Sequence, residues 1–248
     1  LFAEVGLPWA LDDTNRHRLI DMTQTATKLL ENNQGYFLLV EASQVDWAGH
    51  SNDIAAAMHE MDDLAVTMRY LSKYVEENPN TTVVLTADHS TGGFSLGANG
   101  KYLWEPEVIK QLANSPHTIS KELVDNKIEK TKISSLMGFE LTDGELANIV
   151  SAKTDMAEKV VEYNTKLAAA SDEEKKKMRP VQGYRFIEKA IKEIIDTRTT
   201  TGWTTGGHTA IDVPVFALGK HAGMFTGNID NTDIAKKIFN ILDNTSQK

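Results

Sequence analysis

The sequence contains no cysteine and no run of about eighteen apolar residues. Disulfides, thiol nucleophiles and cysteine-ligated zinc are therefore excluded, and no segment has the composition of a membrane span. Basic residues are also few, since 26 Lys+Arg stand against 35 Asp+Glu, which gives a formal net charge of −9. A broad basic face for nucleic acid is therefore not expected. An anionic partner would have to be attracted by something other than lysine and arginine.

The remaining composition is that of a globular protein, with 41% hydrophobic and 25% charged residues. A length of 248 residues suits one large domain, or one domain with an insertion. Apolar periodicity predicts buried strands at three places, 36–40, 82–85 and 214–218. It predicts amphipathic helices before, between and after these strands, at 12–30, 54–75 and 234–242.

Residues 101–200 follow a different pattern from the rest of the chain. Their acidic and basic residues balance, so the whole acidic excess lies in 1–100 and 201–248. Apolar residues recur at helical spacing, and capping boxes are expected at Thr142 and Ser171. The alternation of strands and helices at both ends predicts an α/β fold with a mainly parallel sheet flanked by helices. We expect 1–100 and 201–248 to form this α/β core portion and 101–200 to be a mainly helical insertion.

Carboxylate and imidazole side chains follow two of the predicted strands and precede the third: Glu41, Asp46, His50, Asp88, His89 and His208. Ligands in open α/β sheets collect beyond the carboxyl ends of strands, so the first two clusters are expected to share a site in the loops there. Carboxylate oxygen and imidazole nitrogen, without thiolate, are suited to catalytic zinc or a related divalent ion. From spacing alone, the sequence predicts a divalent-metal hydrolase.

Three segments together resemble the metal motifs of bacterial alkaline phosphatases: VEASQVDWAGHSND at 40–53, TADHSTGG at 86–93 and GGHT at 206–209. Residues 213–242 resemble the closing strand and helix of that family. The resemblance covers about the C-terminal half of such an enzyme, and 101–200 resembles the family's variable crown region. It implies an incomplete alkaline phosphatase-like fold.

The resemblance also implies a role for each candidate ligand. Asp46, His50 and His208 would hold a first zinc, which stabilises the leaving group and later activates water. Asp88 and His89 would hold a second zinc, which lowers the pKa of a serine nucleophile, and Glu41 would belong to a magnesium site. The complete enzyme would carry two Zn²⁺ and one Mg²⁺ and hydrolyse phosphate monoesters through a phosphoserine intermediate.

The chain departs from the family pattern in two respects. Trp47 takes the place where some members carry Lys or His. It is interpreted either as a wall of the phosphate pocket or as a residue that only packs against its neighbours. The same two interpretations apply to Trp203, for which core packing is favoured. No Asp-Ser-Ala nucleophile motif occurs, so no catalytic residue is assigned. The family's N-terminal half, which carries that serine, is therefore an expected partner, and the isolated chain is expected to be inactive.

Two alternatives stay open. A phosphodiesterase, a sulfatase or a metal-dependent phosphoglycerate mutase would share the same metal chemistry, and the isolated chain could instead be a non-catalytic metal-binding fragment. The chain begins at Leu1 without a targeting segment, so we expect that processing or truncation removed an upstream portion. The resemblance implies a periplasmic or extracellular location, with a signal peptide in that portion. It also implies a homodimer, because the crown region often contributes to dimer contacts.

Overall fold

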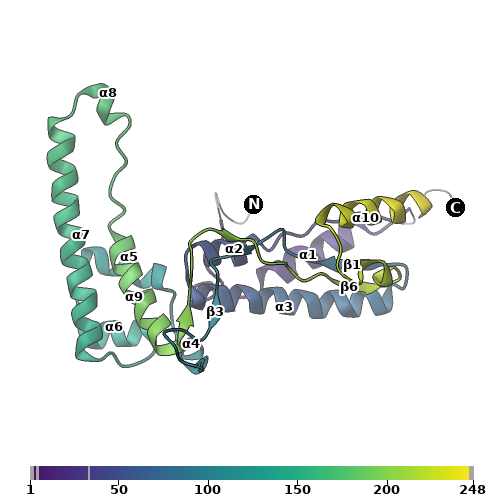
Figure 1. The fold of residues 1–248 in the computed structure, drawn as a ribbon, viewed down its shortest axis with the longest axis horizontal. Helices are drawn as coiled ribbons and strands as arrows, with labels where there is room; N and C mark the ends of the chain where they lie inside the picture. The colour runs from purple at the N-terminus through teal and green to yellow at the C-terminus, as the bar shows by residue number, and fades with distance from the viewer. Residues whose placement is uncertain (1–2, 4–5, 33, 246–248) are drawn as a thin grey trace.

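A computed structural model describes residue 3, residues 6–32 and residues 34–245 (Figure 1). Its helices are α1 (Arg18–Leu30), α2 (Ser43–His50), α3 (Ile54–Glu77), α4 (Glu107–Gln111), α5 (Pro116–Asp125), α6 (Lys130–Met137), α7 (Asp143–Ala169), α8 (Asp172–Lys175), α9 (Tyr184–Thr199) and α10 (Asn231–Thr245), with a 3₁₀ turn η1 (Ala222–Phe225). The strands are β1 (Thr82–Leu85), β2 (Ser90–Thr91), β3 (Ser95–Leu96), β4 (Thr201–Gly202), β5 (His208–Thr209) and β6 (Phe216–Gly219). Among the described helices, none is both long enough and apolar enough to cross a bilayer.

The strands form three antiparallel pairs. β1 pairs with β6 so that Thr82 lies opposite Gly219 and Leu85 opposite Phe216. β2 pairs with β5, and β3 pairs with β4. Each pair joins a segment that precedes the long helical stretch to one that follows it. The strand pairs therefore hold residues 82–96 against residues 201–219.

The sheet differs from the expectation in two respects. Within the described residues every strand pair is antiparallel, so the mainly parallel sheet is not seen there. The predicted strand at 36–40 carries no strand assignment. A strand exists only beside a hydrogen-bonded neighbour. The side chains of 36–40 are also not buried as expected, since Phe37 is 58% exposed and Leu39 79% exposed.

Residues 101–200, all of which the structure describes, contain α4 to α9 and no strand. Both expected capping boxes are present: Thr142 with Glu145 begins α7, and Ser171 with Glu174 begins α8. In each, the hydroxyl accepts a backbone N–H and the glutamate accepts the N–H of the capping residue. Figure 1 shows α7 and the chain that returns from α8 extending away from α3 as an arm.

The apolar core lies mostly among the helices of this stretch. Its fully buried side chains include Ile119, Leu123, Ile133, Met137, Ile149, Ile187 and Ile191. Ile54 and Ala55, at the start of α3, belong to the same cluster. α9 packs against α5 and α7 and also contacts α3. The burial of its apolar face therefore fixes α9 against the portion of the chain that carries the candidate ligands.

A buried polar cluster joins α1, α2 and α3. Nη2 of Arg18, a residue only 7% exposed, donates to both carboxylate oxygens of Glu60 at 3.1 and 3.0 Å. The carboxylate of Asp63 accepts the backbone N–H groups of Arg18 and Leu19. Gln44 of α2 also donates to Glu60, at 3.0 Å. Glu60 therefore fixes the position of α2, the helix that carries two of the candidate ligands.

Candidate metal centre

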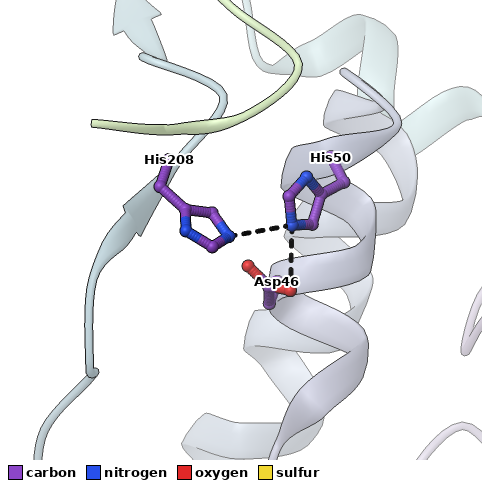
Figure 2. A group of neighbouring side chains, drawn as sticks. All are labelled: Asp46, His50 and His208. Atoms are coloured by element: carbon purple, nitrogen blue, oxygen red, sulfur yellow. Dashed lines mark hydrogen bonds and ion pairs between the residues drawn. The ribbon is translucent and has the colours of Figure 1, made fainter.

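Asp46 and His50 lie on the helix α2, which corrects the expectation that they lie in a loop after a strand. Residues four apart on a helix share a face, so both side chains point the same way (Figure 2). Oδ2 of Asp46 lies 3.5 Å from Nε2 of His50. The helix has only eight residues and includes a glycine, so its apolar periodicity is too short to be recognised in the sequence.

His208, from β5, completes the group in Figure 2. Its Nε2 lies 3.2 Å from Nε2 of His50. One ligand atom from each of Asp46, His50 and His208 can be chosen so that all three lie within 4.8 Å of one another. His50 donates its Nδ1–H to the carbonyl of Gly206 at 2.7 Å, which leaves a lone pair on the Nε2 of the neutral ring. The nitrogen that faces the group is therefore the one able to bind a metal.

The second predicted cluster lies beside the first. The ring of His89 stacks on that of His208, with centroids 3.5 Å apart and 17° between the planes. Nδ1 of His89 lies 3.9 Å from Oδ1 of Asp46, and its Nε2 lies 3.3 Å from Oδ2 of Asp88. Asp88 and Glu41 are both exposed. Among the described residues, the only three-residue group with metal-ligand spacing is Asp46, His50 and His208.

Thr91 is a residue of this site that sequence reasoning missed. Its hydroxyl donates to Oδ1 of Asp46 at 2.5 Å, and Nδ1 of His89 lies 3.2 Å from the same hydroxyl oxygen. It therefore connects the two clusters and holds one oxygen of Asp46, while the other faces His50. A single threonine in a glycine-rich segment gives no signal of such a contact.

The segment before His208 is held in place by Gly92. The carbonyl of Gly92 accepts the N–H groups of Thr204 and Thr205, and its own N–H donates to Gly207. Gly92 has φ +85, and a Cβ there would lie 2.7 Å from the ring of Trp203 and 2.9 Å from the carbonyl of Gly49. Only glycine fits without displacing its neighbours. Trp203 packs against the core, as the sequence predicts.

The last expectation concerns Trp47. Trp47 is 44% exposed, and its ring lies so close to Gly6 that a Cβ there would approach within 2.7 Å. Packing thus accounts for one side of the Trp47 ring. That the exposed side forms a wall of the phosphate pocket stays a prediction. The other histidines lie outside the three-residue group found among the described residues: His17, His59, His117 and His221.

The donor set fits a catalytic zinc ion. Two imidazole nitrogens and one carboxylate oxygen are three protein ligands, the number that leaves a position open for water or substrate. His50 and His208 are exposed and Asp46 is half-buried, so this open position can be reached from solvent.

Comparison with known proteins shows the family to which the chain belongs. A family model described as Alkaline phosphatase matches residues 1–244, and the chain belongs to this family. Alkaline phosphatase 3 of Bacillus subtilis (strain 168) is 42% identical over 245 residues, which are 98% of this chain and 48% of that protein. The chain therefore spans about half the length of this relative.

Solved structures give the same result. The cold-active alkaline phosphatase of Shewanella sp. is 40% identical, with a TM-score of 0.84 over 98% of this chain and 54% of that one. A mutant of TAB5 alkaline phosphatase with Mg bound in its M3 site is 22% identical, with a TM-score of 0.55 over 98% of this chain and 46% of that one. The alkaline phosphatase-like α/β fold, in incomplete form, is thereby confirmed.

Proposed function

We propose that this chain is the C-terminal portion of an alkaline phosphatase that hydrolyses phosphate monoesters. The observation that carries the proposal is the meeting of Asp46, His50 and His208, whose ligand atoms lie within 4.8 Å although they come from two distant segments. In this proposal they hold a first zinc ion. Residues 1–100 and 201–248 form the metal-binding portion, and 101–200 form an insertion of the crown type.

Two further ions belong to the proposed complete enzyme. Asp88 and His89 contribute to a second zinc site, which the stacking of His89 on His208 supports, and Glu41 contributes to a magnesium site. When bound, such ions polarise the phosphate ester and offset charge on the attacking and leaving oxygens. They also explain how a chain of net charge −9 attracts an anionic ester, because bound cations dominate the local field.

The chain's own residues prepare the first site for its ion. The carbonyl of Gly206 fixes the His50 ring and its tautomer, and His89 orients the His208 ring by stacking. Thr91 holds Oδ1 of Asp46 and leaves Oδ2 directed at His50. Groups that hydrogen-bond to metal ligands or stack on them set the orientation and basicity of those ligands before the metal binds.

The nucleophile of the proposed reaction comes from the N-terminal half of the complete enzyme. The chain has no Asp-Ser-Ala motif, so no residue here is assigned to the phosphoserine intermediate. Exposed apolar side chains fit this proposal, because the absent half could cover them: Leu39, Phe37, Phe216 and Phe239 are between 57% and 79% exposed. Export to the periplasm or cell surface and homodimerisation through the insertion complete the proposal by family resemblance.

The test is to load purified 1–248 with zinc and magnesium and to assay a phosphate monoester beside the complete enzyme. We expect negligible turnover by 1–248, full activity in the complete enzyme, and loss of that activity on the change His208→Ala. The nucleophile would have to lie within 1–248 if this chain turned over substrate within about tenfold of the complete enzyme and Asp46→Ala abolished that turnover. Faster hydrolysis of a phosphodiester or a sulfate ester by the complete enzyme would favour the alternative enzymes instead.

A further inference from the structure

α9 carries a polar stripe beside its buried apolar face. Glu188, Lys192 and Asp196 follow one another at intervals of four residues and therefore lie on one side of the helix. Oε2 of Glu188 lies 3.7 Å from Nδ1 of His117, which keeps this contact within 101–200. The other two side chains contact segments of the metal centre.

Lys192 holds the end of the helix that carries Asp46 and His50. Its Nζ donates to the carbonyl of Ser51 at 2.6 Å, and Ser51 is the C-terminal cap of α2. The last carbonyls of a helix have no partner within it and carry partial negative charge, so an ammonium group there is stabilising. The Lys192 side chain is only 19% exposed, and Glu188 lies 3.8 Å from its Nζ. The lysine is thus held in place on α9 and does not move freely in solvent.

Asp196 holds the segment that leads to His208. It accepts a hydrogen bond from Nε1 of Trp203 at 3.2 Å. The Trp203 ring in turn lies against Gly92, whose carbonyl binds the N–H groups of the next two residues. Burial raises the pKa of Asp196 to about 7, and the indole hydrogen bond opposes this rise.

We infer that Lys192 and Asp196 are positioning residues of the metal centre. From one rigid helix they fix the separation between α2, which carries Asp46 and His50, and residues 203–208, which lead to His208. The inference rests on the proposed metal site and gives the insertion a part in assembling it. A change of about 1 Å in this separation is enough to spoil ligand geometry.

The experiment measures Co²⁺ and Zn²⁺ binding to metal-stripped 1–248 by absorption titration and by competition with a chromogenic chelator. We expect Lys192→Met and Asp196→Ala each to weaken binding at the first site by about 10- to 100-fold and to alter the Co²⁺ absorption bands. Asp196→Asn keeps the acceptor for Trp203 and should restore wild-type binding to within about threefold. Lys189→Met is the matched control, because Lys189 is on the same helix, 77% exposed, and paired with Glu193.

The outcomes separate the inference from the proposed function. The inference is overturned if Lys192→Met and Asp196→Ala both bind metal within about twofold of wild type and keep the same Co²⁺ bands. The proposed metal site still stands in that case if His208→Ala abolishes binding. Failure of the wild-type chain to bind either ion overturns the metal site and the inference together.

A double-mutant cycle decides the matter if Lys192→Met does not fold. Trp203→Phe removes the Nε1–H donor but keeps an aromatic ring against Gly92. If Asp196 acts through Trp203, the double change Asp196→Ala with Trp203→Phe weakens metal binding no more than either single change. Additive effects overturn the inference.

Discussion

Nε2 of His208 lies 3.2 Å from Nε2 of His50, although 158 residues separate the two histidines. Because the Nδ1 of His50 is occupied by the carbonyl of Gly206, its neutral ring accepts a hydrogen bond at Nε2 and His208 donates it. The two rings therefore meet at the atoms that a metal ion would bind. The protein brings its ligands together through backbone contacts, and an ion that binds there stabilises the folded chain.

The first prediction concerns His208 itself. We expect His208→Ala to weaken zinc binding to metal-stripped 1–248 by more than about 100-fold, because loss of a direct ligand costs more than the 10–100-fold typical of its neighbours. The measurement is a competition titration with a chelator. His59→Ala is the control, since His59 donates to the carbonyl of Ala55 within α3 and should leave binding unchanged. Equal losses in both variants would contradict the assignment.

The second prediction concerns the hydroxyl of Thr91. Thr91→Val keeps the shape of the side chain and its contact with Gly49 but removes the donor to Asp46. We expect zinc affinity to fall by about tenfold or more, since an unheld carboxylate must be ordered when the ion binds. Thr91→Ser retains the hydroxyl and should bind as wild type does. If valine and serine behave alike in the same titration, the hydroxyl does not orient Asp46.

The third prediction concerns stability and pH. Burial raises the pKa of Asp53 from 3.8 to about 6. Because the folded pKa is higher than the unfolded one, Asp53 contributes stability that is present below about pH 4 and is lost as the pH rises through 6. Two pKa units correspond to about 3 kcal/mol.

Asp53→Asn tests this linkage because it cannot ionise, and its amide oxygen can still accept the N–H of Ala56. Between pH 4 and 7, the free energy of unfolding of wild type should fall by about 2–3 kcal/mol relative to that of the variant. Urea unfolding of both proteins in the presence of a chelator gives the two pH profiles. Parallel profiles would rule out the raised pKa.

The fourth prediction compares two glycines. Gly92→Ala places a Cβ 2.7 Å from the Trp203 ring at a position with φ +85, so it should destabilise the fold by more than about 1 kcal/mol and weaken metal binding. At Gly144, in the first turn of α7, a Cβ meets nothing within 4 Å. Gly144→Ala should therefore raise stability by up to about 0.5–1 kcal/mol. Thermal unfolding of both variants checks the contrast, and a stable Gly92→Ala protein with normal metal affinity would contradict it.

Features set by neighbouring residues could be predicted from the sequence. The strand Thr82–Leu85 and both capping boxes occur where they were expected, because their signals lie within a few residues of one another. The end of α3 before Asn78-Pro79 follows from the same local chemistry. The resemblance of three short motifs to alkaline phosphatases further predicted that Asp46, His50 and His208 belong together, and the structure places them side by side.

Contacts between distant segments that no motif marks were decided by the tertiary structure alone. Residues 36–40 have the composition of a buried strand, but a strand forms only where a neighbour offers hydrogen bonds. α2 is too short to be recognised from periodicity, and its position depends on Gln44 reaching Glu60 and on Lys192 reaching Ser51. These partners lie 16 and 141 residues apart, so no local pattern records them. Lys192 reaches the carbonyl of Ser51 only because burial of the apolar face of α9 brings the insertion against the candidate metal centre.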